Sequence, residues 1–113
     1  MGDGSGSAVQ RWWKVLGPDE LPEGKVKAVS VGDRKICLVH FAGSYAALDN
    51  ECAHQGGPLG DGEIVRGRLV CPWHGWHYEP LTGHLIGYQH GVASHRVEVR
   101  PDGVYVAIGS DGP

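Results

Sequence analysis

The sequence predicts an all-β fold, a small antiparallel barrel or sandwich, and three observations lead to it. Glycine is unusually common, with 19 residues among 113, and these glycines recur with 7 prolines at turn-like intervals. The short segments between them have strand character, and residues 95–100 alternate apolar with charged side chains. No window shows a helical period. A chain of this length builds one compact domain.

The first half of the chain is expected to form a meander of short strands. Residues 11–16 make the first strand, which stops where a Gly-Pro pair breaks the extended run. The next three strands are joined by two-residue turns that contain glycine, the usual connection in antiparallel hairpins. These strands are Lys25–Val31, Arg34–Phe41 and Ser44–Asp49.

The second half contains two further hairpins. Residues 63–65 and 68–71 flank an Arg-Gly turn, and residues 95–100 and 104–108 flank a Pro-Asp-Gly turn. The stretches 50–62 and 72–78 are too rich in glycine, proline and histidine to be strands. We expect them to be loops on a rigid β scaffold, where functional sites usually lie.

Composition argues against several classes of protein. The formal net charge is −3 and the basic residues are scattered singly, so nucleic-acid binding is not expected. No apolar run approaches the roughly 20 residues of a membrane helix, and the N-terminus lacks the regions of a signal peptide. We expect a cytoplasmic protein without membrane contact. Residues 1–10 would be a flexible leader, 11–109 the single domain and 110–113 a flexible tail.

Two cysteines and two histidines in the expected loops have the spacing of metal ligands. The first loop holds Cys52 and His54, and the second holds Cys71 and His74, so the pattern is C-x-H, sixteen residues, then C-x-x-H. The hairpin between the loops would bring all four side chains to one point. Such a set can hold a [2Fe–2S] cluster or a tetrahedral zinc ion.

The arrangement of these residues favours the cluster over zinc. Zinc fingers commonly pair cysteines together and histidines together, whereas each loop here supplies one of each. Two neutral imidazoles on one iron raise the reduction potential into a range of about −150 to +300 mV. We expect Gly56, Gly57 and Gly75 to let backbone N–H groups approach the sulfurs, and Pro58 and Pro72 to stiffen the loops.

The chain resembles the Rieske-type ferredoxins, the soluble, oxygenase-associated type of Rieske [2Fe–2S] protein. The family pattern is present in Cys52, His54, Cys71 and His74, within the strings CAHQGGPLG and CPWHGW, and the similarity runs over about residues 12–108. It implies a Rieske-like β fold with a cluster-binding subdomain of two loops. It also implies one [2Fe–2S] cluster per chain, with both cysteines on one iron and both histidines on the other.

Several positions separate this chain from the respiratory-complex type of the family. That type carries an extra cysteine in each loop, and these form a disulfide, whereas Gly57 and Trp73 stand here. It also has a serine where this chain has Trp76. Tyr78 matches a tyrosine that donates a hydrogen bond to a ligand cysteine in high-potential members, although simple packing in the sheet is an equal alternative. We expect a potential below that of the respiratory type.

The potential is also expected to fall as the pH rises through the alkaline range. Reduction adds negative charge beside the ligand imidazoles, which raises the pKa of their free nitrogens. Voltammetry between about pH 6 and pH 11 would check this expectation, since these limits bracket the ordinary pKa of histidine and its raised value. A potential that stays constant over this range would contradict it.

The other histidines and the third cysteine have ordinary structural roles by default. His84, His90 and His95 lie in or near residues 85–91, a stretch that is proline-rich in the family and lacks proline here. These three, with His40 and His77, are expected to be exposed or hydrogen-bonded. Cys37 is expected to be a buried, inert thiol. Trp73 and Trp76 would shield the cluster, form an apolar docking patch, or do both.

The resemblance implies an electron-transfer protein rather than an enzyme. Such ferredoxins pass electrons from a flavin-dependent NAD(P)H reductase to a terminal oxygenase. The alternative is a small Rieske subunit of a larger redox enzyme, such as a nitrite reductase. Because 39 residues follow His74, we expect no room for the two-histidine, one-carboxylate iron site of a terminal oxygenase.

Overall fold

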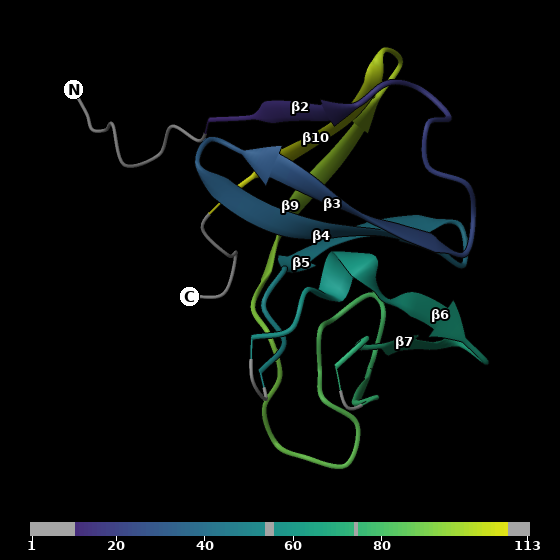
Figure 1. Ribbon diagram of the computed structural model, residues 1–113. Helices are drawn as coiled ribbons and strands as arrows, with labels where there is room; N and C mark the ends of the chain where they lie inside the picture. The colour runs from purple at the N-terminus through teal and green to yellow at the C-terminus, as the bar shows by residue number, and fades with distance from the viewer. Residues whose placement is uncertain (1–10, 54–55, 74, 109–113) are drawn as a thin grey trace.

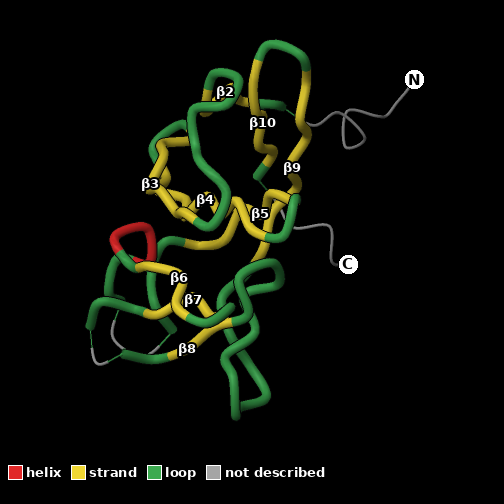
Figure 2. The backbone as a smooth tube through the Cα atoms, turned by 90° about the vertical axis from the view of Figure 1, so that its right-hand side faces the viewer, coloured by secondary structure: helices red, strands yellow, loops and turns green. Residues whose placement is uncertain are grey.

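The computed structural model describes residues 11–53, 56–73 and 75–108, and they form two antiparallel sheets. The larger sheet has six strands in the order β2-β10-β9-β5-β4-β3, and the smaller has the order β6-β7-β8. Figure 1 shows the small sheet and the long loops below the large sheet, and Figure 2 shows the same division from the side. The predicted all-β class is therefore confirmed. None of the described residues belongs to a helix long and apolar enough to cross a membrane.

The strands lie close to the predicted ones. In the large sheet they are β2 (Trp13–Leu16), β3 (Lys25–Val31), β4 (Arg34–Phe41), β5 (Ser44–Asp49), β9 (Ser94–Arg100) and β10 (Gly103–Ala107). The small sheet contains β6 (Glu63–Val65), β7 (Arg68–Val70) and β8 (His77–Tyr78). The edge strands β2 and β3 contact each other, so the large sheet curls into a nearly closed barrel.

Strand β4 is buried on both faces, which explains its continuous apolar run. Ile36 and Leu38 point into the barrel, where they pack with residues such as Val104 and Val106. Cys37 and Val39 point to the opposite face, toward the small sheet and its loops. Because successive side chains of a strand alternate between faces, β4 serves two cores at once. The second core positions the loops, since it includes both Cys52 and Cys71.

Two short elements were not predicted within the expected loops. The loop 50–62 contains a 3₁₀ turn, η1 (Leu59–Asp61), whose Gly60 lies so close to β3 that a Cβ there would be 2.6 Å from the Cβ of Ala28. The expected loop 72–78 ends in β8, where Tyr78 pairs with Leu69 of β7. A strand of two residues carries too little pattern to be found in a sequence.

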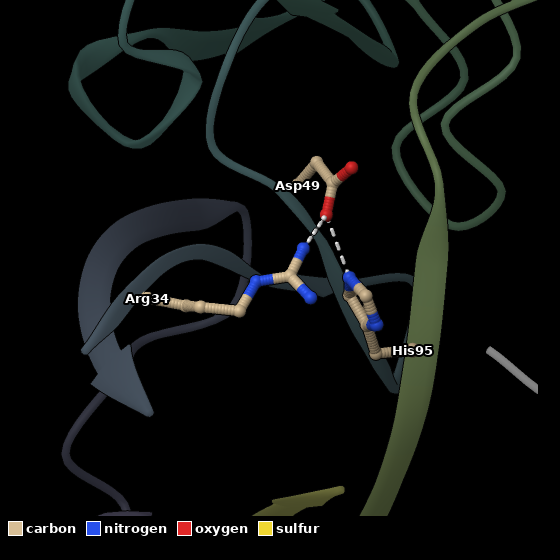
Figure 3. A network of polar contacts seen from close by, with 3 residues as sticks. All are labelled: Arg34, Asp49 and His95. Atoms are coloured by element: carbon tan, nitrogen blue, oxygen red, sulfur yellow. Dashed lines mark hydrogen bonds and ion pairs between the residues drawn. The ribbon is translucent and has the colours of Figure 1, made fainter. Parts of the chain in front are cut away.

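A polar network joins three strands of the large sheet just before the first cysteine loop. One oxygen of Asp49, at the end of β5, accepts hydrogen bonds from Arg34 Nη2 at 3.1 Å and from His95 Nε2 at 2.7 Å (Figure 3). The His95 side chain is only 4% exposed, and its Nδ1 is buried with no partner among the described residues. An unpaired lone pair is easier to bury than an unpaired N–H, so the proton of a neutral imidazole is assigned to Nε2.

Replacing Asp49 with alanine is expected to lower the melting temperature by several degrees. The change leaves the buried Nε2–H of His95 without an acceptor, which costs about 1–3 kcal/mol. Arg34→Ala is the matched control, because its half-exposed ion pair contributes about 1 kcal/mol or less. Melting should be compared at one scan rate. Equal losses in the two variants would contradict this account of His95.

Candidate metal centre

Two buried thiols meet where the cysteine loops leave their strands. Cys52 follows β5 and is 4% exposed, and Cys71 follows β7 and is 1% exposed. Neither forms a disulfide. Burial raises the pKa of the Cys71 thiol to about 11, the backbone N–H of Trp73 lowers it, and the adjoining Cys52 thiol raises it again. The two sulfurs are therefore close enough to interact.

The first loop is closed by its own backbone. The N–H of Cys52 donates to the carbonyl of Gly57 at 2.7 Å, and the N–H of Gly56 donates back to the carbonyl of Cys52 at 2.9 Å. Gly56 has a φ of 75°, a left-handed conformation that glycine adopts without strain. The Leu59 N–H then donates to the Asn50 carbonyl at 2.7 Å. These bonds fix the direction in which Cys52 projects.

The second loop is a tighter version of the same design. The N–H of Cys71 donates to the carbonyl of Trp76 at 2.9 Å, and Gly75 has a φ of 71°. The backbone N–H of Trp73 lies on the side of the loop where it lowers the pKa of the Cys71 thiol. A nearby N–H dipole favours a thiolate. The second loop thus supplies a buried sulfur and a backbone dipole that favours its ionised form.

Gly57 lies where the two loops touch. A Cβ at this position would be 2.8 Å from Trp73 Cγ and 3.0 Å from Cys71 Sγ. Because any larger residue would push the second loop away, glycine is required here by space. The contact joins the two loops into one binding site.

Tyr78 lies beneath the first loop, fully buried, with its hydroxyl oxygen 2.9 Å from Cys52 Sγ. The N–H of Ala53 donates to the same oxygen at 2.8 Å, so the phenol's own proton is left for the sulfur. Burial, and then the Cys52 side chain, raise the pKa of Tyr78, which keeps the phenol protonated. The two alternatives for Tyr78 are therefore both true. The ring packs in the sheet, and the hydroxyl meets Cys52, a predicted ligand.

The structure brings two of the four predicted ligands together and leaves the other two untested. His54 and His74 lie outside the described residues. Among the described side chains, no group of three or more His, Cys, Asp and Glu residues gathers around a metal-sized point. The two buried thiols form no disulfide, and one of them meets the Tyr78 hydroxyl, so they match the thiolate half of a Rieske ligand set.

The approach of backbone N–H groups to the sulfurs stays a prediction. The Gly56 N–H itself donates to the Cys52 carbonyl. Among the described residues, the Tyr78 hydroxyl meets the Cys52 sulfur, and the Trp73 N–H lowers the pKa of the Cys71 thiol. Any residue can supply a backbone N–H, so the composition of the loop carried no signal for the role of Trp73. The glycines provide left-handed turns and room for the second loop.

The five histidines predicted to be exposed or hydrogen-bonded are so in the structure. The His40 ring stacks on Tyr45 at 4.1 Å between centroids, and its Nδ1 lies 2.7 Å from the Leu21 carbonyl. His95 is held by Asp49. His77, His84 and His90 are exposed. In residues 85–91, the stretch that is proline-rich in the family, the Leu85 N–H donates to the His90 carbonyl at 2.9 Å, and this bond closes a turn without proline.

The third cysteine is buried, as predicted. Cys37 is fully buried in β4, and burial raises the pKa of its thiol to about 12. A buried thiol of this kind is neither a nucleophile nor a metal ligand at neutral pH.

Comparison with known proteins identifies the family. The model of the Rieske [2Fe–2S] domain matches residues 11–98. Among curated proteins, mouse apoptosis-inducing factor 3 is 35% identical over 89 residues, which are 79% of this chain and 15% of that protein. The ferredoxin component of the naphthalene 1,2-dioxygenase system of Pseudomonas aeruginosa is 29% identical over 77 residues, 68% of this chain and 74% of that one. This chain thus spans only a small part of the mouse protein and most of the ferredoxin component.

Solved structures show the same fold. The ferredoxin of carbazole 1,9a-dioxygenase from Nocardioides aromaticivorans IC177 superposes with a TM-score of 0.77 at 24% identity, covering 87% of this chain and 98% of that one. A chain in the complex of reduced oxygenase and oxidised ferredoxin in carbazole 1,9a-dioxygenase gives 0.76 at 25% identity, covering 88% and 94%. Domains of this kind bind one [2Fe–2S] cluster each. On the match over residues 11–98, this chain belongs to the Rieske [2Fe–2S] domain family.

Proposed function

We propose that this chain is a one-electron carrier that relays electrons from a flavin-dependent NAD(P)H reductase to a terminal oxygenase. Cys52 and Cys71 would bind one iron of the cluster, and His54 and His74 the other. The observation that carries the proposal is the meeting of two buried, unbridged thiols across abutting loops of a Rieske domain. Similarity over 74% of the length of a dioxygenase ferredoxin component supports it.

The cluster, when bound, takes up one electron and gives it up again. The residues of this chain hold its surroundings fixed, because two hydrogen-bonded loops and a buried tyrosine leave the thiols little freedom to move. Trp73 and Gly75, the neighbours of His74 in the chain, are both exposed. Exposure of this loop supports an electron path that leaves the protein there. No catalysis on a substrate is assigned to the chain.

The relay can be tested with the reductase and oxygenase components of the naphthalene 1,2-dioxygenase system. The purified protein should be coloured and give an EPR signal after reduction. With NADH, the reductase should reduce it, and the oxygenase should reoxidise it in the presence of naphthalene. A colourless, EPR-silent protein containing zinc would overturn the cluster assignment. If the cluster is present but exchanges electrons with neither the reductase nor the oxygenase, the proposed relay is overturned.

The second candidate is a Rieske subunit of a larger redox enzyme. It is favoured by the relatives in which this domain is only part of a longer chain, namely 15% of apoptosis-inducing factor 3 and about a third of dicamba monooxygenase. Native purification distinguishes the two candidates. A free carrier elutes alone as a small protein, whereas a subunit elutes with a much larger chain.

Replacing Tyr78 with phenylalanine is expected to lower the reduction potential by about 40 mV. The hydroxyl proton favours the more negative sulfur of the reduced state, and a difference of roughly 1 kcal/mol between the two states corresponds to that shift for one electron. Voltammetry of the loaded protein measures it. Tyr45→Phe is the matched control, because Tyr45 stacks on His40 in the large sheet. A similar potential in wild type and Tyr78→Phe would contradict this role.

A further inference from the structure

The outer face of the small sheet carries an unusual combination of side chains. Ile64, Leu69 and Tyr78 point inward to the core around the thiols. Alternation then places Val65 and Arg68 in one outward-facing row and Glu63, Val70 and His77 in the next. Apolar and basic residues thus lie side by side toward the tip of the hairpin, and the one carboxylate of these two rows, Glu63, lies at the far end beside Val70.

Two hollows on this side join into one surface, which we call the outer trough. The first, of about 610 Å³, is lined by Val65, Arg66, Arg68, Val70 and His77. The second, of about 240 Å³, shares Arg68 and His77 with the first and continues to Gly75, Trp76 and Tyr88. The outer trough thus runs from the tip of the β6–β7 hairpin to the second cysteine loop.

The cations of the outer trough have no partners within the described part of the chain. Neither Arg66 nor Arg68 forms an ion pair there, whereas Lys27, Arg34 and Arg100 each pair with a carboxylate. The formal net charge of the chain is −3, so unpaired arginines at one place oppose the overall charge. Both guanidinium groups are exposed, so water solvates them in this chain and they are available to the carboxylates of another molecule.

The hairpin holds Arg66 in an unfavourable backbone conformation. Arg66 and Gly67 have φ values of 53° and 78°, which is a type I′ turn. Asn or Asp is the usual first residue of that turn, and a long side chain is strained there. Ala42 and Gly43, at the turn between β4 and β5, have the same combination with φ values of 54° and 78°, so the turn sets the direction of the hairpin tip and does not by itself indicate a role for the Arg66 side chain.

The other end of the outer trough is aromatic. Trp76 and Tyr88 stack in parallel, with centroids 5.3 Å apart and 9° between the ring planes. Tyr88 is 52% exposed and Val65, at the opposite end, is 42% exposed. Arginine and aromatic residues are enriched in protein interfaces. A partner must therefore offer both carboxylates and apolar side chains.

We propose that the outer trough docks an acidic, partly apolar surface segment of the electron-transfer partner, with its carboxylates on Arg66 and Arg68. This inference rests on the proposed carrier function and names the chemistry of the partner. The position supports it, because the outer trough ends at Gly75, the residue after His74 in the chain. Asp61 and Glu63 line a hollow of about 200 Å³ that adjoins the outer trough at Val70. The charge on this side is therefore divided, basic toward Arg66 and Arg68 and acidic toward Asp61 and Glu63, and would orient the partner.

Stopped-flow reduction of the oxidised, loaded protein by dithionite-reduced flavodoxin, an acidic one-electron donor, tests the proposal. Two net-acidic proteins that meet at random should react faster as salt screens their repulsion. Docking in the outer trough instead predicts a rate constant that falls with salt. Arg68→Glu is expected to lower the rate at low salt by about 10-fold or more and to reverse the salt dependence.

Arg96→Glu is the matched control, because it makes the same change in net charge on an exposed residue of β9. Equal rates in Arg68→Glu and Arg96→Glu would overturn the docking surface and leave the carrier function standing. A wild-type cluster that flavodoxin does not reduce would instead count against the carrier function. In that case the docking surface is tested by the binding of a synthetic Glu/Leu peptide, measured by tryptophan fluorescence. Loss of peptide binding in Arg68→Glu alone supports docking in the outer trough. Equal binding by Arg68→Glu and Arg96→Glu overturns it.

A second copy of this chain is the competing occupant. Sedimentation velocity of the loaded protein distinguishes it from a different partner. A monomer at working concentration supports the proposal. A dimer that Arg68→Glu dissociates and Arg96→Glu preserves would overturn it, because the outer trough would then be a self-association surface.

Discussion

Replacing Cys52 or Cys71 with serine is expected to abolish the [2Fe–2S] cluster, its colour and the EPR signal of the reduced protein. Both thiols are buried and adjoin each other, so no other described cysteine can take the place of either. A serine hydroxyl is a harder and far less acidic ligand than a thiol and holds iron–sulfur clusters poorly. Cluster binding also contributes to folding, so both variants should melt at lower temperature.

Cys37→Ala separates loss of a ligand from loss of a buried thiol. Cys37 is fully buried on β4, in the core between the large sheet and the small sheet with its loops. The variant should retain the full cluster content and lose about 1 kcal/mol of stability from the small cavity. Iron and sulfide analysis, with EPR of the reduced samples, measures the outcome. Full cluster content in Cys52→Ser would show that the ligand assignment is wrong.

The strands could be predicted from the sequence because their pattern is local. The run Ile36-Cys37-Leu38-Val39 indicated a buried strand, and two-residue turns fixed the hairpins on either side of it. The division of that run between two cores could not be predicted. It depends on which elements cover each face of β4, and those elements come from distant parts of the chain.

The surroundings of the thiols were only partly predictable for the same reason. The spacing of Cys52 and Cys71 indicated that their loops meet, and the resemblance drew attention to Tyr78. The packing of Gly57 against Trp73 and the pairing of β8 arise only when the loops are folded against each other. His54 and His74 remain predictions, because they lie outside the described residues.

Gly57→Ala is expected to reduce cluster content severely, whereas Gly56→Ala should be tolerated. A Cβ on Gly57 would lie 2.8 Å from Trp73 Cγ and 3.0 Å from Cys71 Sγ, so the second loop must move and carry a proposed ligand with it. A Cβ on Gly56 would meet no atom of the described residues within 4 Å.

The two glycines therefore test different physical effects with the same added methyl group. Gly56 has a φ of 75°, so alanine there costs about 1–2 kcal/mol of backbone strain and displaces none of the described residues. Gly57 has no such strain, and its cost comes from the contact between the loops. Iron content per chain measures both variants. If Gly56→Ala lost more cluster than Gly57→Ala, backbone conformation rather than loop contact would determine the site. The opposite order would show that the close approach of the two loops is what holds Cys71 in position to bind iron.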